Sequence, residues 1–150
     1  MNINDLRNLI DNKSRLIGVD IGSKRIGLSI SDENRKIATP LKTIDYINIQ
    51  TLIDEIENIV KENNIGAIIF GNPKNMDGTE GSSSQFVKDK IKLISKKITI
   101  PIALWDERLS TVAAFNISSQ LDVNVSKRVK NIDKNAAAFI LQGALDFLNN

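Results

Sequence analysis

The residues best suited to chemistry are acids that occur where a charge is unexpected. Asp20 ends one strongly apolar run, and Asp106 and Glu107 follow a second one. Asp133 lies just before an apolar helical segment. A buried carboxylate is costly unless it is paired, hydrogen-bonded or bound to a metal. Clustered carboxylates favour Mg²⁺ or Mn²⁺, and two such ions about 4 Å apart can promote phosphodiester hydrolysis.

The composition narrows the choice of chemistry further. The chain has no histidine and no cysteine. This excludes Ser-His-Asp and Cys-His catalysis, histidine-ligated zinc and any thiolate site or disulfide. Carboxylates, lysines and hydroxyls are left as the working groups of an enzyme that acts on polar bonds.

A structural role is an alternative for each acid. The Asp20 carboxylate would then accept hydrogen bonds from the amides of Gly22 or Ser23 in the following turn. Asp106 or Ser110 would begin the next helix, because acids are favoured near a helix N-terminus. Either Asp106 or Glu107 can be the working acid, and the sequence leaves this choice open.

Asp133 belongs to a regular helical stripe. The other members lie 3, 4, 7, 11 and 14 positions further on and are all apolar: Ala136, Ala137, Ile140, Ala144 and Phe147. Asp133 therefore points the same way as the buried face of the helix, and the alanines allow a close approach to a sheet. The alternative is an N-cap role at the helix start. The functional interpretation is favoured because a capping aspartate need not follow the stripe.

The apolar periodicity predicts the elements that position these acids. We expect strands at 15–21, 25–32, 35–44, 65–71 and 99–105, and helices at 3–12, 48–62, 83–97, 110–119 and 132–148. Turn residues predict a loop at 72–84, and the polar, basic residues 121–131 predict a mobile loop. Pro40 predicts an edge position for the third strand. The order βββαβαβα fits an α/β fold with a mixed five-stranded sheet, three strands antiparallel and two parallel, flanked by helices.

The length of 150 residues suits one domain at 15–150, preceded by an N-terminal extension, 1–14, with a short helix. The polar N-terminus is not a signal peptide, and no apolar run approaches the roughly 20 residues of a membrane span. We therefore expect a cytoplasmic protein without a membrane partner. The net charge is only +2. The basic clusters at 88–97 and 126–130 are either solvated surface or nucleic-acid contacts.

Four motifs in order resemble the YqgF family: "GVDIGSKRIGLSISD", "GNPKNMDGTEG", "WDERLST" and "IDKNAAAFILQGALDFL". The resemblance spans about residues 15–148. It implies a ribonuclease H-like fold and a metal-dependent nuclease that processes the 5′ end of pre-16S rRNA during ribosome biogenesis, or a Holliday-junction resolvase that acts on branched DNA. It implies that Asp20, Glu107 and Asp133 are the catalytic acids and hold one or two Mg²⁺ or Mn²⁺ ions. Implied partners are nucleic acid and ribosomal precursor particles, with a monomer and a homodimer both open.

Two of the motifs depart from the family pattern. Asn72 and Lys74 stand where an apolar "GLPL" is expected, and "DERLST" replaces "DERLTT". Neither departure touches an acid, but Asn72 changes the loop that is expected to border the cleft. The predicted substrate-binding residues, mostly as phosphate contacts, are Lys24, Arg25, Asn72, Arg108, Lys127 and Arg128. Pairing with a neighbouring acid is an equal alternative for Arg108.

Two other classes of function fit parts of the sequence. The first motif also resembles the phosphate-binding hairpin of actin-like ATPases and sugar kinases, but such proteins use two domains and no second phosphate loop follows. A non-catalytic RNA-binding assembly factor that kept the fold is the other class. The retained acids favour the nuclease over both.

Overall fold

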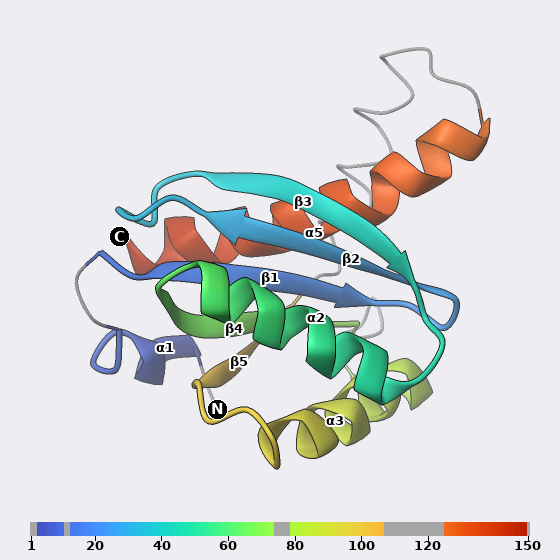
Figure 1. The fold of residues 1–150 in the computed structure, drawn as a ribbon, viewed down its shortest axis with the longest axis horizontal. Coiled ribbons are helices and arrows are strands. Elements are labelled where there is room, and N and C mark those ends of the chain that lie inside the picture. The colour runs from blue at the N-terminus through green and yellow to red at the C-terminus, as the bar shows by residue number, and fades with distance from the viewer. Residues whose placement is uncertain (1–2, 11–12, 74–78, 107–124, 150) are drawn as a thin grey trace.

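The computed structural model describes residues 3–10, 13–73, 79–106 and 125–149, with side chains from Asn135 onward in the last range. Its central element is one five-stranded sheet of order β3-β2-β1-β4-β5 (Figure 1). The elements in chain order are α1 (Ile3–Leu6), β1 (Arg15–Ile21), β2 (Arg25–Ser31), β3 (Ala38–Asp45), α2 (Ile49–Glu62), β4 (Ile65–Asn72), α3 (Ser82–Ser95), β5 (Ile102–Asp106) and α5 (Val125–Leu148).

The sheet is mixed, as the sequence predicts. β1, β2 and β3 form an antiparallel meander, whereas β4 and β5 run parallel to β1. The ribonuclease H-like architecture is therefore confirmed. β1, β4 and β5 all end on the same side of the sheet, which we call the carboxyl edge. In an open α/β sheet, ligand sites gather at this edge.

Helices cover both faces of the sheet (Figure 1). On one face, α2 and α3 bury a large aliphatic core that includes Ile17, Val19, Ile56, Ile68 and Phe70. On the other face, α5 and the short α1 close a core of smaller residues, among them Ala67, Ala103 and Ala144. β1 and β4 are buried on both faces, which is why their sequences are almost continuously apolar.

The contact between α5 and the sheet is unusually close at the middle of β1. The Ser29 hydroxyl donates a 2.8 Å hydrogen bond to the carbonyl of Ala137. A methyl group at Gly18 would lie 2.8 Å from Cβ of Leu141 and 2.9 Å from the carbonyl oxygen of Ala137. Helix and strand therefore meet backbone to backbone, as the alanine stripe predicts.

Polar contacts fix the direction of α5. The Gln142 amide oxygen accepts from the N–H of Ala38 at 2.8 Å, and Asn149 donates to the carbonyl of Arg35 at 2.7 Å. Both partners flank the β2–β3 turn, at the end of the sheet where β1 begins. α5 thus runs antiparallel to β1, and its N-terminal half lies toward the carboxyl edge.

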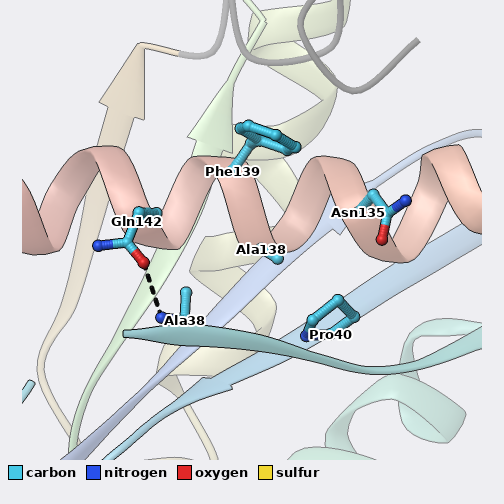
Figure 2. A pocket seen from close by; sticks show the side chains of 6 residues that line it. All are labelled: Ala38, Pro40, Asn135, Ala138, Phe139 and Gln142. Atoms are coloured by element: carbon cyan, nitrogen blue, oxygen red, sulfur yellow. Dashed lines mark hydrogen bonds between the residues drawn. The ribbon is translucent and has the colours of Figure 1, made fainter. Parts of the chain in front are cut away.

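A groove separates α5 from the edge strand β3 (Figure 2). It has a volume of about 310 Å³ and is lined by Ala38, Pro40, Asn135, Ala138, Phe139 and Gln142. The hydrogen bond from Ala38 to Gln142 closes one end of the groove. The edge position that Pro40 predicts for this strand is confirmed, because β3 is the outermost strand of the sheet, beside β2.

Several expected elements differ in length. β3 begins at Ala38 and not at residue 35, and β5 begins at Ile102 and not at residue 99. In the described residues the last helix begins at Val125, so residues 125–131 are helix and not loop. This stretch has few apolar residues because it extends past the sheet (Figure 1), but lysine and arginine are good helix formers. The first helix ends at Leu6, and Leu9 is 51% exposed. Ile3 and Leu6 are buried, so the N-terminal segment packs on the domain. The expected helix at 110–119 lies outside the described residues.

Candidate active site at the carboxyl edge

Asp20 stands near the end of β1, the central strand of the sheet. Its face of the strand is shared with Leu16 and Gly18, as the alternation of side chains predicts. Leu16 packs in the core beneath α5, and Gly18 touches that helix directly. The partly buried Asp20 side chain therefore points to the α5 side of the sheet, beside the last residues of the strand.

Asp133 lies within α5, one helical turn before Ala137. Four helical residues rise about 6 Å, and the two strand residues from Gly18 to Asp20 rise about 6.6 Å. Because the helix runs antiparallel to β1, both steps lead from the Gly18 contact toward the carboxyl edge. With at least eight helical residues before it, Asp133 is interior to the helix. The alternative of an N-cap role is therefore wrong.

Asp106 belongs to the opposite face of the sheet. It pairs in register with Asn72 of β4, and the side chain of Asn72 contacts α3. The residue before it, Trp105, packs against Gly143 of α5. Asp106 thus faces α3 while Asp20 faces α5. Glu107 and Arg108 lie outside the described residues.

Asn72 is a buried, hydrogen-bonded residue at the end of β4. Its side chain is 5% exposed and accepts a 2.5 Å hydrogen bond from the hydroxyl of Ser84 in the first turn of α3. Its amide nitrogen donates to the carboxylate of Glu80 at 3.3 Å, and Lys88 pairs with the other Glu80 oxygen. This network joins β4 to α3 at the base of the loop. The Asp77–Gly78 turn of that loop lies outside the described residues.

The sequence predicted a binding role for Asn72 but did not predict its network. The polar run "GSSS" was assigned to the loop, and nothing in it distinguished Ser84 from its neighbours. The signal for the network was Asn72 itself, a polar residue where the family pattern has an apolar one. A polar residue at the end of an otherwise apolar strand needs a buried partner.

The predicted phosphate contacts fall into two groups. Lys24 is exposed in the β1–β2 turn, and Arg25 is partly buried at the start of β2. Gly22 tightens this turn by donating its N–H to the carbonyl of Arg25 at 2.8 Å. Lys127 and Arg128 lie in the first turn of α5 as described, so their predicted position in a loop is wrong.

The described side chains contain no group of three acids that could hold a metal. Of the predicted triad, Asp20 alone has a described side chain. Its carboxylate at the mouth of the sheet is a hard oxygen donor, the kind that Mg²⁺ and Mn²⁺ prefer. The backbone of Asp133 approaches from α5 on the same face. The donor chemistry at this edge therefore fits a divalent cation.

Comparison with known proteins agrees with this geometry. A family model described as "RuvX: Holliday junction resolvase" matches residues 14–147. This chain belongs to the RuvX family. The match covers nearly the whole domain and confirms the resemblance to YqgF, which names the same family.

Relatives of this RuvX chain are similar over their full lengths. A protein of Pelagibacter ubique named "Putative pre-16S rRNA nuclease" is 65% identical over 148 residues, which cover 99% of this chain and 98% of the relative. A protein of Methylocella silvestris with the same name is 40% identical over 99% of this chain and 92% of the relative. Both relatives have nearly the same length as the matched chain.

A solved structure shows the same fold at low sequence identity. The structure titled "T. thermophilus RuvC in complex with Holliday junction substrate" superposes with a TM-score of 0.51. It is 11% identical and covers 88% of this chain and 93% of its own.

Among the residues that the structure describes, no helix is long and apolar enough to cross a membrane.

Proposed function

We propose that this RuvX-family chain is a metal-dependent nuclease that processes the 5′ end of pre-16S rRNA in the cytoplasm, on ribosomal precursor particles. The full-length identity of 65% to a relative named for this activity supports the substrate. One structural observation carries the chemistry: Asp20 and the Asp133 turn of α5 approach the carboxyl edge on the same face of the sheet.

The proposed catalytic acids are Asp20, Glu107 and Asp133. Side chains alternate along a strand, and Asp106 faces α3. This position argues against Asp106 as the partner of Asp20 and supports its neighbour Glu107. Asp133 completes the proposed triad. It lies one helical turn before Ala137, and Asp20 lies two residues after Gly18, so both are displaced by a similar distance from the Gly18–Ala137 contact toward the carboxyl edge.

These three carboxylates would hold one or two Mg²⁺ or Mn²⁺ ions. A bound divalent cation supplies charge stabilisation for the phosphate oxygens during hydrolysis. In that reaction water adds to phosphorus, one P–O ester bond breaks, and a phosphate monoester and a free hydroxyl remain.

Residues of this chain bind and orient the substrate. Lys24 and Arg25 extend from the turn that follows Asp20 and would contact phosphates near the scissile bond. Arg108, Lys127 and Arg128 are the other proposed contacts. The Asn72 network fixes the end of β4 next to the loop, so its proposed part in substrate binding includes positioning that loop.

Cleavage of a precursor fragment tests the proposal. The purified chain is incubated with an RNA that spans the 5′ end of 16S rRNA, with Mg²⁺, with Mn²⁺ or with EDTA. We expect cleavage with either metal and none with EDTA. Asp20→Asn and Glu107→Gln should reduce the rate by at least about 100-fold, because each removes a charge from the proposed metal site.

Asp106→Asn is the matched control, since it removes a charge from the same edge of the sheet but from the other face. It should retain most of the activity. Equal cleavage by Asp20→Asn and the parent would contradict the site. Loss of activity in Asp106→Asn with retention in Glu107→Gln would assign the second acid to Asp106.

Holliday-junction resolution is the second candidate, because the family model carries that description. A four-way DNA junction is symmetric, so two active sites and a homodimer are expected for this activity. The same variants, tested on a four-way junction and on the precursor RNA, separate the two substrates. Faster cleavage of the junction than of the RNA would favour the resolvase.

A further inference from the structure

Two aromatic rings and one lysine form a compact patch where α3 meets the end of β3. The rings of Tyr46 and Phe86 have centroids 6.4 Å apart and planes inclined at 51°. The Lys90 ammonium lies 5.7 Å from the Tyr46 centroid and 5.1 Å from the Phe86 centroid. We call these three residues the aromatic patch.

The aromatic patch borders the carboxyl edge. The N–H of Tyr46 donates a 2.8 Å hydrogen bond to the carbonyl of Lys24, in the turn that follows Asp20. Phe86 lies in the second turn of α3, just beyond Ser84, which bonds to the end of β4. In Figure 1 the β1–β2 turn, the end of β3 and the start of α3 lie at the same end of the molecule.

Core packing explains only part of this arrangement. Both rings pack on the aliphatic core under α2 and α3, yet both stay partly exposed, whereas Phe70 in the same core is fully buried. Ile47, next to Tyr46, is 73% exposed and extends the apolar surface. A closed core would leave neither ring edges nor an isoleucine at the surface.

The cations and rings of this region suit a nucleic acid, which combines negatively charged phosphates with planar bases. Lys24 is exposed beside Tyr46, and Lys90 stands over both rings. Asp45 and Asp89 are exposed acids next to these residues in the chain, and the Asp89 carboxylate accepts a 2.8 Å hydrogen bond from the side chain of Gln85. Exposed aromatic faces with interleaved cations are how proteins bind unpaired bases, because every base offers a π face and every nucleotide a phosphate.

We propose that the aromatic patch, which lies on the α3 face of the sheet and borders the carboxyl edge, stacks an unpaired base of the substrate a short distance along the nucleic-acid strand from the scissile bond. This inference deepens the proposed nuclease function and rests on it. The stacked base must be unpaired, because a paired base hides its faces in the helix. The substrate class is therefore a nucleic acid with a single-stranded segment beside the cut. Lys90, which lies over both rings in the unbound chain, then moves aside to contact the phosphate of the stacked nucleotide.

Binding without cleavage tests the inference directly. A labelled single-stranded RNA that carries 2-aminopurine is titrated with the full chain in EDTA, and anisotropy and 2-aminopurine fluorescence are recorded together. The same RNA in a blunt duplex is the comparison. We expect tighter binding and fluorescence quenching for the single strand. Tyr46→Leu and Phe86→Leu should each weaken its binding about tenfold and relieve the quenching, whereas Tyr46→Phe should keep both.

The chain offers matched controls for ring and charge. Phe147 also lies beside another aromatic ring and under a cation, Arg7, but it belongs to the C-terminal end of α5, on the other face of the sheet and away from the carboxyl edge. Phe147→Leu should leave RNA affinity within about twofold. Lys90→Met keeps both rings and should weaken binding about threefold, whereas Lys96→Met at the far end of α3 should not. Lys90→Met also keeps the test open if a ring variant fails to fold.

The outcomes separate this inference from the proposed function. Unchanged affinity and quenching in the ring variants and in Lys90→Met would overturn the patch, even if the parent cleaves RNA. Ring-dependent binding by a chain that cleaves nothing would support the patch and contradict the nuclease. A parallel titration with DNA of the same sequence shows whether the site distinguishes the two sugars. Equal binding of single strand and duplex would also overturn the inference.

Discussion

The two faces of the sheet are built in different ways. The face under α2 and α3 is filled by large side chains such as Ile56, Ile68 and Phe70, all fully buried. The face under α5 brings backbone close to backbone, through Gly18 and a hydroxyl bond from Ser29. The first face excludes much apolar area from water and should supply most of the stability. The second face buries less but fixes the distance between a strand and a helix.

The stability of the fold and the positioning of the candidate site therefore depend mainly on different faces of the sheet. Asp20 and Asp133 belong to the α5 face, where small residues and hydrogen bonds set the geometry. Large side chains can repack, whereas a helix held against a glycine has little freedom to move. A change on the α5 face should therefore cost more activity for each kcal/mol of stability lost than a change on the other face. Four variants test this difference.

The largest loss of stability is expected from Phe70→Ala. Removing this fully buried ring should lower the free energy of unfolding by about 3–5 kcal/mol. The molecules that stay folded should keep a cleavage rate close to that of the parent. Urea unfolding gives the stability, and single-turnover cleavage well below the melting temperature gives the rate. Phe70→Leu, with a smaller cavity, should lose less stability and the same small amount of activity.

Gly18→Ala should cost less stability and more activity. A methyl group there would meet the Ser29 hydroxyl, the Leu141 side chain and the Ala137 carbonyl at under 3 Å, so Ser29 and α5 must shift. We expect a loss of about 1–3 kcal/mol. The cleavage rate should fall at least tenfold, since small displacements of catalytic groups are costly. The emission of the single tryptophan, Trp105, which lies against α5, should shift as well.

Gly66→Ala is the control for that change. Its added methyl group would meet Ser14 at a similarly short distance, but at the end of the sheet where β1 begins, away from the carboxyl edge. It should cost comparable stability and leave both the cleavage rate and the Trp105 emission unchanged. Equal losses of activity in the two glycine variants would argue that general destabilisation, and not the position of α5, limits the reaction.

Ser29→Ala should have a smaller effect. It removes the hydrogen bond to the Ala137 carbonyl, which should cost about 1 kcal/mol. The cleavage rate should fall severalfold because the helix loses one of its ties to the sheet. Ser31→Ala on the same strand also removes hydrogen bonds, but these join Leu16 and Asp32 rather than α5. A fall in rate for Ser31→Ala as large as for Ser29→Ala would contradict the positioning role.

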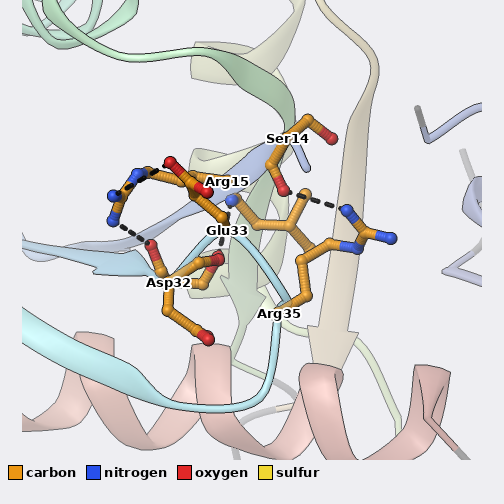
Figure 3. A network of polar contacts seen from close by, with 7 residues as sticks. Ser14, Arg15, Asp32, Glu33 and Arg35 are labelled. Atoms are coloured by element: carbon orange, nitrogen blue, oxygen red, sulfur yellow. Dashed lines mark hydrogen bonds and ion pairs between the residues drawn. The ribbon is translucent and has the colours of Figure 1, made fainter. Parts of the chain in front are cut away.

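Asp32→Asn should have the smallest effect. Asp32 belongs to a polar network in the β2–β3 turn that also includes Ser14, Arg15, Glu33 and Arg35 (Figure 3). Backbone N–H groups, first that of Ile37 at 3.0 Å and also that of Lys36, lower the pKa of Asp32, while partial desolvation opposes them. The turn lies at the end of the sheet far from the carboxyl edge.

The sign of the pH effect follows from this lowered pKa. A folded-state pKa below the unfolded value means that Asp32 stabilises the fold above about pH 4, and that this contribution disappears as the pH falls through the folded-state pKa. Asp32→Asn should lose less than about 1 kcal/mol at pH 7, because the turn is solvated. The loss should be smaller at pH 3 than at pH 7. An equal loss at both pH values, measured by urea unfolding, would assign it to geometry instead of charge.

The sequence predicted most of the fold because the sheet enforces its own pattern. β1 begins and ends at the predicted residues, and the stripe from Ala136 to Ala144 is buried as expected. The start of α5 was wrong because residues 125–131 are rich in lysine and arginine, which form helices well without an apolar stripe. The helix at 3–12 was predicted too long, because Leu9 fits the apolar stripe but is exposed.

The candidate site was less accessible to prediction. Alternation along β1 correctly put Asp20 on the face that it shares with Leu16 and Gly18, but the sequence alone did not say which helix covers that face or which face Asp106 would take. That answer needed the register of β5 against Asn72. The roles of Glu107 and Arg108 stay predictions. The aromatic patch was not predicted at all, because Tyr46 and Phe86 are 40 positions apart and neither belongs to a motif.

The bond between Ser29 and Ala137 also has a consequence for synthesis. These residues are separated by 108 positions in the chain. At roughly 5–20 residues per second, the ribosome needs about 5–20 seconds to make the helix that closes over the nascent hairpin. Until then the proposed nuclease lacks Asp133 and the element that carries it. On the proposed mechanism a half-made copy would be unable to cut, which would protect the RNA of the ribosome that is producing it.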